Sequence, residues 1–250
     1  TDVWVPSGKN VKPQVGVQYA AGYFRDFKER IFEASVEVYY KDMFNQIEYA
    51  EGTQPQDGGN ANYDEFLVFG KGWSYGAEFF INKLKGKLTG WIGYTISRTW
   101  RKFPALNDGN KFPAKFDRRH DMSIVALYEL NAKWKISATF VYGTGNAFTL
   151  PVNFYIFDGV LTQEYSKINQ YRLPAYHRLD FAAILTPSKS KNRKWQTQWV
   201  FGAYNVYSRK NPYFIYFDQT GSPYDGSLKI QGKQVSIFPI IPSVTWNFKF

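Results

Sequence analysis

The chain has 250 residues, a formal net charge of +10 and no cysteine, so a disulfide framework, a thiolate metal site and a cysteine nucleophile are excluded. Phe, Tyr and Trp make up 20% of the residues, which favours strands and membrane interfaces over helix interiors. The mean hydropathy is -0.42, and no stretch approaches the roughly 20 apolar residues that a membrane-spanning helix needs. A transmembrane β-barrel is not excluded, because only the lipid-facing side of each strand is apolar.

Alternation of apolar and polar residues, the primary signal of β-strands, recurs along the whole chain. It is clear at 32–41 (FEASVEVYYK), where Phe, Ala and Val alternate with Glu and Ser, and it is cleanest at 243–250 (SVTWNFKF). The pattern predicts nine long strands, at 13–25, 31–48, 67–83, 87–100, 118–130, 134–143, 175–186, 195–206 and 240–250.

The connections between these strands alternate between short and long. The short ones are 26–30, 84–86, 131–133 and 187–194, and the long ones are 49–66, 101–117, 144–174 and 207–239. Outer-membrane barrels have short periplasmic turns, longer extracellular loops and normally an even number of strands, so this rhythm places Phe250 in the periplasm and Thr1 outside. We therefore expect residues 1–250 to be the carboxy-terminal part of an all-β, transmembrane antiparallel β-barrel, with earlier strands preceding them.

Most of the positive charge lies in the short connections and their immediate flanks. Only Asp26 and Glu29 oppose the basic residues there, which are Lys28, Arg30, Lys83, Lys85, Lys87, Lys133, Lys135, Lys189, Lys191, Arg193 and Lys194. Because this charge is spread over turns separated by whole strands, nucleic acid is not expected as a partner. One hypothesis is that the turns contact anionic lipid headgroups, each cation contributing up to about 1 kcal/mol. The alternative is solvated turns that aid solubility.

Three carboxylates, Glu33, Glu37 and Glu78, lie on the polar register of their strands and are expected to face the barrel lumen. Paired carboxylates are also a glycosidase signature, but Glu33 and Glu37 lie on one strand, and no companion motif accompanies them. The sequence has no phosphate-binding loop, Ser-His-Asp order or nucleophile elbow. We expect neither an enzyme nor a cofactor or metal.

Two charged runs open later strands, at 116–121 (FDRRHD) and 177–180 (HRLD). Their histidines, His120 and His177, are too few and too far apart for a metal site or His-based catalysis, so we expect hydrogen-bonding roles in the polar interior. The other charges could pair with a plug or substrate, or only with one another along the wall. These further lumen-facing or plug-facing candidates are Arg118, Arg119, Asp121, Arg178 and Asp180.

The long connections are rich in aromatic residues, Asn and Asp. Such side chains bind planar or sugar-like ligands by stacking and hydrogen bonding, although an aromatic girdle at the membrane surface has the same composition. The candidates for extracellular ligand contact are Tyr63, Trp100, Phe103, Tyr165, Tyr213 and Tyr216.

Six stretches carry a family resemblance, namely 34–47 (ASVEVYYKDMFNQI), 72–79 (GWSYGAEF), 112–121 (FPAKFDRRHD), 171–180 (YRLPAYHRLD), 202–212 (GAYNVYSRKNP) and 239–250 (PIIPSVTWNFKF). In this order they resemble TonB-dependent outer-membrane transporters of the kind common in Bacteroidetes. The resemblance implies a barrel of about 22 strands with an amino-terminal plug domain. It also implies uptake of a scarce ligand, such as a siderophore, cofactor, glycan or peptide, with energy from the TonB complex.

The resemblance further implies that Phe250 is an assembly signal for the barrel assembly machinery. The plug domain, the TonB-contacting segment and the earlier strands have no counterpart within residues 1–250. Two other functions stay open, a passive porin-like channel and a surface-exposed binding or accessory barrel of an envelope complex. A soluble β-sandwich lectin is disfavoured, because its strands would have about five to six residues and several predicted here are longer than ten.

Overall fold

The computed structural model describes residues 6–53, 63–158, 160–187, 196–222 and 224–249. These residues form an all-β structure whose main body is one antiparallel sheet, as predicted. No helix in the described part of the chain is long and apolar enough to cross a membrane.

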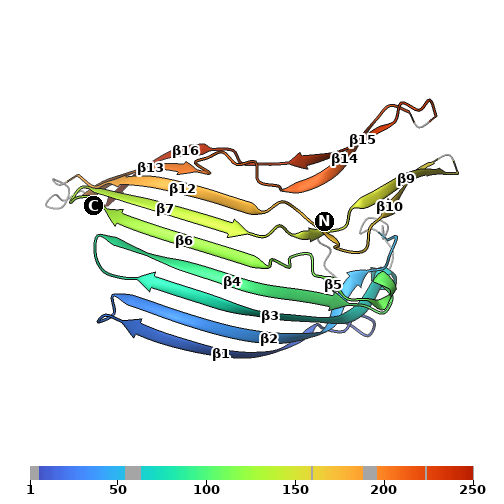
Figure 1. Ribbon diagram of the computed structural model, residues 1–250, viewed down its shortest axis with the longest axis horizontal. Coiled ribbons are helices and arrows are strands. Elements are labelled where there is room, and N and C mark those ends of the chain that lie inside the picture. Colours follow the sequence, from blue (N-terminus) through green and yellow to red (C-terminus); the bar gives the residue numbers. More distant parts are fainter. Residues whose placement is uncertain (1–5, 54–62, 159, 188–195, 223, 250) are drawn as a thin grey trace.

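Nine long strands make up the path of the main sheet, in the order β1-β2-β3-β4-β6-β7-β12-β13-β16 (Figure 1). Each strand therefore pairs with the next long strand along the chain, and the sheet is a simple antiparallel meander. The nine predicted strands are confirmed, with bounds of β1 (Val15–Phe27), β2 (Phe32–Tyr49), β3 (Leu67–Lys83), β4 (Leu88–Lys102), β6 (His120–Glu129), β7 (Trp134–Gly143), β12 (Tyr176–Leu185), β13 (Gln196–Tyr204) and β16 (Ile241–Lys249).

The register of the sheet continues one polar row and one apolar row from strand to strand. Glu37 is opposite Glu78, Glu78 opposite Thr95, and Thr95 opposite Asp121. The adjacent row joins the apolar residues Val36, Phe79, Tyr94 and Met122 in the same way. Since side chains alternate between the faces of a strand, the sheet has one polar face and one apolar face.

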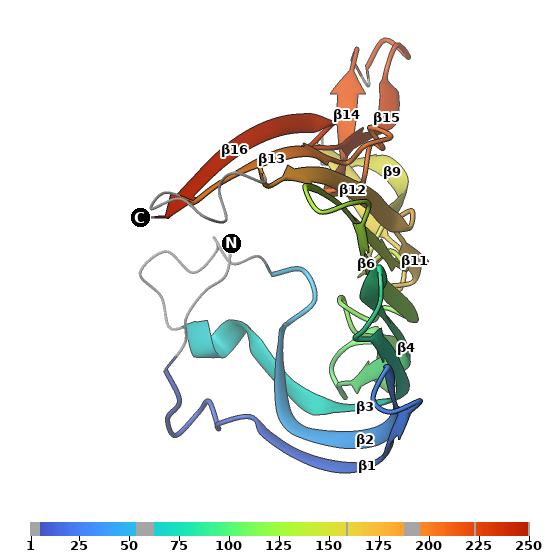
Figure 2. The same cartoon turned by 90° about the vertical axis from the view of Figure 1, so that its left-hand side faces the viewer.

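The sheet is curved into an open arc (Figure 2). Within the described residues, β1 and β16 each pair on one side only and form the two edges of the arc. A groove of about 610 Å³ crosses five neighbouring strands on the polar face. In the predicted transmembrane barrel the polar face lies on the inside of the curve and the apolar face on the outside.

The apolar face remains exposed in this structure. Val36 is 41% exposed, Ile92 46% and Trp246 53%, and many other large apolar side chains of the face are similar. An apolar surface of this extent marks an interaction with a partner or a membrane. The buried apolar cluster is small and lies elsewhere, among Phe103, Leu106 and Phe112 in the connection after β4.

The long connections contain strands that the sequence interpretation treated as loops. Two hairpins project beyond the main sheet at one end (Figure 1), β9 (Pro151–Phe157) with β10 (Val160–Tyr165), and β14 (Phe214–Thr220) with β15 (Lys229–Val235). The shorter elements are β5 (Phe112–Pro113), β8 (Ala147–Phe148), β11 (Tyr171–Arg172) and the 3-10 turns η1 (Tyr63–Phe66) and η2 (Asn107–Gly109). We call this end of the sheet the loop end and the opposite end, where the short connections lie, the turn end.

Candidate functional site

The inner face of the sheet gathers acidic side chains in one groove. Four predicted lumen-facing residues, Glu33, Glu37, Glu78 and Asp121, line the 610 Å³ groove together with Asp26. They come from β1, β2, β3 and β6, which the register places side by side through β4. The structure thus brings together carboxylates that are up to 95 residues apart in the sequence.

Two of these carboxylates are without a counter-charge. Glu37 and Glu78 are directly opposite each other on adjacent strands, and neither forms a hydrogen bond or ion pair within the part of the chain that the structure describes. Like charges that are directly opposite destabilise a sheet. Glu33 accepts a hydrogen bond from Asn82 at 3.1 Å, and Asp26 pairs with Arg30 at 3.2 Å. The centre of the groove therefore offers negative charge to whatever fills it.

The charged run 116–121, which leads into β6, contributes Asp121 to the groove. Arg118 forms an ion pair with Asp121 at 3.3 Å and donates to the Asn146 side chain at 3.4 Å. Gly143 makes room for this guanidinium, because an added Cβ there would lie 3.2 Å from Arg118 Nη1. Arg119 points into a separate hollow with Tyr39 and its neighbours, and its buried Nε has no partner in the described residues. Arg118 and Asp121 therefore pair with each other, whereas Arg119 keeps a free donor.

The second predicted charged pair belongs to the wall itself. Arg178 contacts Asp180 at 2.9 Å, donates to the Tyr204 hydroxyl at 2.6 Å and to the Tyr176 hydroxyl at 3.0 Å, and lies 4.1 Å from the Tyr204 ring centroid. Asp180 also accepts the backbone N–H of Asn205 at 2.9 Å. Both charges have partners on β12 and β13, so this pair rigidifies the wall.

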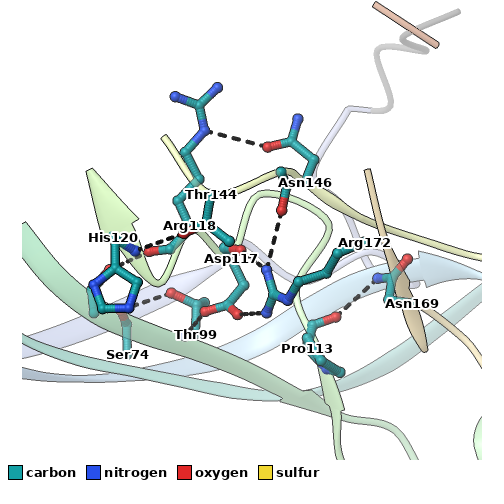
Figure 3. A network of polar contacts seen from close by, with 12 residues as sticks. Ser74, Thr99, Pro113, Asp117, Arg118, His120, Thr144, Asn146, Asn169 and Arg172 are labelled. Carbon is teal, nitrogen blue, oxygen red and sulfur yellow. Dashed lines mark hydrogen bonds and ion pairs between the residues drawn. The ribbon is translucent and has the colours of Figure 1, made fainter. Parts of the chain in front are cut away.

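The most deeply buried charge was missed by the sequence interpretation. Asp117 is 2% exposed and forms an ion pair with Arg172, which also donates to the Asp117 carbonyl (Figure 3). The other carboxylate oxygen accepts the backbone N–H of Thr99 at 2.6 Å. Arg172 reaches the carbonyl of Gly145 at 3.3 Å as well. This clamp fixes the connection 101–117 and both ends of the connection 144–174 onto the end of β4.

A buried asparagine plays the same role at the other side of the sheet. Asn205 is fully buried, and its side-chain amide donates to the carbonyls of Arg209 and Phe238, both at 2.9 Å. Its side-chain oxygen accepts the backbone N–H of Arg209 at 3.1 Å. Asn205 has a φ of 53°, in the left-handed region that Asn tolerates. The asparagine therefore turns the chain after β13 and ties both ends of the last long connection together.

The two histidines form the predicted hydrogen bonds, but they lie on the apolar face of the sheet and not in the polar interior, where they were predicted. His120 Nδ1 is 2.7 Å from the Tyr94 hydroxyl, and His177 Nδ1 is 2.7 Å from the Tyr207 hydroxyl. His120 shares the register of Met122 and Ile124, and His177 that of Tyr142, so both belong to the apolar face. The expectation that they line the interior is wrong. The face on which a side chain lies depends on its position along the alternating strand and not on its polarity. Partial desolvation raises the pKa of the Tyr207 hydroxyl.

The loop aromatics separate into three groups. Phe103 is fully buried and stacks on Phe112 with the ring centroids 5.9 Å apart. It therefore has no surface for a ligand, and its prediction as a ligand contact is wrong. Trp100 lies under Lys111, whose Nζ is 4.9 Å from the ring centroid, as in an aromatic girdle. The hairpin residues Tyr165, Tyr213 and Tyr216 are 57%, 65% and 42% exposed.

Some predicted positions lie outside the described residues, namely Phe250, the side chain of Tyr63, and the basic residues Lys189, Lys191, Arg193 and Lys194. The described residues hold no group of three or more His, Asp or Glu side chains that could bind a metal ion.

Comparison with known proteins identifies the family. Residues 1–222 match the family model "TonB dependent receptor-like, beta-barrel". The chain belongs to this family. The resemblance found in the sequence is therefore confirmed, and the location of the family is the outer membrane.

Solved structures of two receptors have the same fold. One is the ferric-catecholate import receptor Fiu from E. coli K12 in its closed form, with 12% identity and a TM-score of 0.56, matched over 98% of this chain and 29% of the receptor. The other is the ferripyoverdine receptor of the outer membrane of Pseudomonas aeruginosa bound to ferripyoverdine, with 12% identity and a TM-score of 0.57, matched over 95% of this chain and 27% of the receptor. The chain thus spans less than a third of either receptor. No curated protein matches the chain.

Proposed function

We propose that residues 1–250 form part of the barrel wall of a TonB-dependent active transporter. Family membership over residues 1–222 and an antiparallel sheet with one polar and one apolar face support this role. The open edges, β1 and β16, have free backbone groups for further strands, in a barrel of about 22 strands. Such a protein takes up a scarce ligand, and the ligand class stays open among siderophores, cofactors, glycans and peptides.

The acidic groove on the inner face is the observation that carries this proposal. Glu37 and Glu78 are opposite each other without a counter-charge among the described residues, so a cationic surface inside the barrel would relieve their repulsion. A plug domain with Lys or Arg side chains that face Glu37 and Glu78 is such a surface. A passive channel would leave the two carboxylates to water and would have no need of a fitted partner.

We also propose an orientation of the sheet in the membrane and two further partners, the TonB complex and the barrel assembly machinery. The turn end faces the periplasm, where the TonB complex acts on the plug, and the loop end faces the cell exterior, in keeping with the loop lengths of outer-membrane barrels. Lys249 is opposite Gln196 at the turn end, which this orientation puts on the periplasmic side, and the proposal keeps Phe250 as the assembly signal for the barrel assembly machinery.

The test replaces the two groove carboxylates in the full-length receptor. Glu37→Lys with Glu78→Lys would repel a basic plug, and we expect cells with this variant to become sensitive to vancomycin, which the intact outer membrane excludes. The matched control is Glu164→Lys, a charge reversal on the β10 hairpin outside the groove, which should leave resistance unchanged. An unplugged channel would show equal vancomycin entry for wild type and variant, and that result would contradict the proposal.

Active transport is tested separately from plugging. Cells with the wild-type receptor are given labelled ferric siderophores, corrinoids, oligosaccharides and peptides, with and without a protonophore. We expect one class to accumulate only while the proton-motive force is intact. Accumulation that a protonophore leaves unchanged would support a porin-like channel instead.

A further inference from the structure

The turn end of the apolar face holds two cations with no acidic partner. Lys28 Nζ and Lys83 Nζ each lie 6.0 Å from the ring centroid of Phe32. Neither lysine forms an ion pair with any described residue. Lys28 also has a φ of 49°, and Glu29 and Arg30 beside it have φ values of 54° and 62°, a conformation that glycine adopts at lower cost. The turn thus keeps a lysine where backbone geometry alone would favour glycine.

An apolar groove of about 250 Å³ begins at these cations on the same face. Its walls are Ile81, Leu88, Ile92 and Ile124 from β3, β4 and β6, and its mouth is formed by Phe32 and Lys83. Ile81 is 52% exposed, Leu88 47% and Ile92 46%, so the groove is open along the sheet surface.

The lining of the groove includes a glycine that no other residue can replace. Gly90 has a φ of 142°, and a Cβ added there would lie 2.0 Å from the Val125 carbonyl oxygen. Its neighbours across the strands are Lys83 on one side and Ala126 on the other. Because no side chain fits at position 90, the backbone there forms the floor of a trough that begins beside Lys83 on the neighbouring strand.

We propose that this groove binds one anionic phospholipid, with an acyl chain along Gly90 and the phosphate between Lys28 and Lys83. The groove opens on the apolar outer face of a barrel in the outer membrane, where its surroundings are acyl chains rather than water or another protein. Two unpaired ammonium groups at the mouth match a phosphodiester with net negative charge, and their aliphatic stems pass over the groove rim toward the headgroup level. The inference rests on the membrane location of the family and on the proposed orientation of the turn end toward the periplasm, and it does not depend on the proposed transport.

The site is distinct from a general attraction of basic turns for a negative surface. Lys85 and Lys87 lie in the turn between β3 and β4, next to Lys83, and Lys85 donates to the Glu29 carbonyl at 3.0 Å. Neither Lys85 nor Lys87 lines the groove or lies over the Phe32 ring. Removing the charge of Lys85 and Lys87 therefore removes as much charge as removing that of Lys28 and Lys83, but leaves the groove mouth intact.

The experiment is native mass spectrometry of the full-length receptor in detergent, titrated with dioleoylphosphatidylglycerol or dioleoylphosphatidylcholine. We expect the wild type to bind one phosphatidylglycerol in preference to phosphatidylcholine. Lys28→Gln with Lys83→Gln should weaken phosphatidylglycerol binding on the order of twentyfold, whereas Lys85→Gln with Lys87→Gln should change it by less than about twofold. Equal losses for the two pairs of variants would overturn the site.

A second variant tests the groove without changing any charge. Ala126→Leu fills the trough from the lipid side and should abolish binding of the single phosphatidylglycerol, while glycerol 3-phosphate, which has the phosphate without acyl chains, should not displace the bound lipid. Unchanged lipid binding in Ala126→Leu, or displacement by glycerol 3-phosphate, would contradict an acyl-chain site. These lipid measurements succeed or fail independently of vancomycin exclusion and ligand accumulation, so the two proposals are separable.

Discussion

The two ends of the sheet are built in opposite ways. At the loop end, Asp117, Asn205 and Phe103 are buried, and hydrogen bonds and stacking fix the connections onto the strands. At the turn end, the described residues of the short connections include no buried side chain, and lysines dominate. Buried, fully paired polar groups specify one conformation, whereas exposed charges contribute little to stability. The loop end is therefore a rigid platform for the projecting hairpins, and the turn end is free to interact with its surroundings.

The largest effect that this contrast leads us to expect is at the buried ion pair. Arg172→Ala leaves the Asp117 carboxylate buried without its partner, which should reduce the free energy of unfolding by about 3 to 5 kcal/mol. Tryptophan fluorescence during guanidinium unfolding of the full-length receptor measures this change. Lys167→Ala, the loss of an exposed cation in the same connection, is the matched control and should change little. Equal stability of Arg172→Ala and the wild type would show that the clamp does not hold the loop end.

A smaller loss is expected at the buried amide. Asn205→Ala removes two donated hydrogen bonds and one accepted hydrogen bond, leaving the carbonyls of Arg209 and Phe238 without a partner. The free energy of unfolding should fall by roughly 1 to 3 kcal/mol. Asn205→Asp keeps the acceptor but loses the donors, so it should recover only part of the loss. Hydrogen exchange across 205–212 should rise in both variants, and unchanged exchange would contradict the role given to Asn205.

The turn end should respond far less. Lys85→Gln removes one exposed cation and its hydrogen bond to the Glu29 carbonyl, and the free energy of unfolding should change by less than about 0.5 kcal/mol. The same unfolding measurement applies. A loss as large as that of Arg172→Ala would remove the distinction between the two ends.

The smallest effect is a pH dependence at the tip of the β14–β15 hairpin. Hydrogen bonds from the Ser227 hydroxyl and backbone N–H, at 2.5 Å and 2.9 Å, hold the pKa of the exposed Asp225 carboxyl below its ordinary value. The turn is therefore stabilised above that ordinary value, and the stabilisation is lost as the pH falls through the depressed pKa. The protection factor of the Ser227 amide, followed as the pH is lowered from 7 until the Asp225 carboxyl is protonated, measures it. In Asp225→Asn the protection should no longer depend on pH, and persistence of the pH dependence would contradict this assignment.

Much of the main sheet could be predicted from the sequence because its physics is local. Alternation and turn residues placed β3 (Leu67–Lys83) and β7 (Trp134–Gly143) at their observed bounds. Residues 151–157 (PVNFYIF), which form a strand of a projecting hairpin, lack this alternation because they are largely apolar and aromatic. Their aromatic content was interpreted as a loop surface, and the strand was missed for that reason.

The loop-end clamps could not be predicted in the same way. Asp117 and Arg172 are 55 residues apart, and nothing local distinguishes Asp117 from Asp121 within the same charged run. The histidines were placed in the interior because they are polar, although their parity with Met122 and Tyr142 was already visible in the sequence. Phe103 was taken as a ligand contact because burial within a long connection depends on Phe112 and Leu106 folding over it.

The central claim is that the loop end faces the cell exterior and the turn end the periplasm. Residues 1–250 contain no cysteine, so Tyr216→Cys on the β14 hairpin and Lys85→Cys in the short turn between β3 and β4 each add one labelling site, and the receptor without either substitution is the control for labelling elsewhere. A membrane-impermeant maleimide applied to intact cells should label Tyr216→Cys and should label Lys85→Cys only after the outer membrane is permeabilised. Labelling of Lys85→Cys, and not of Tyr216→Cys, on intact cells would contradict the account.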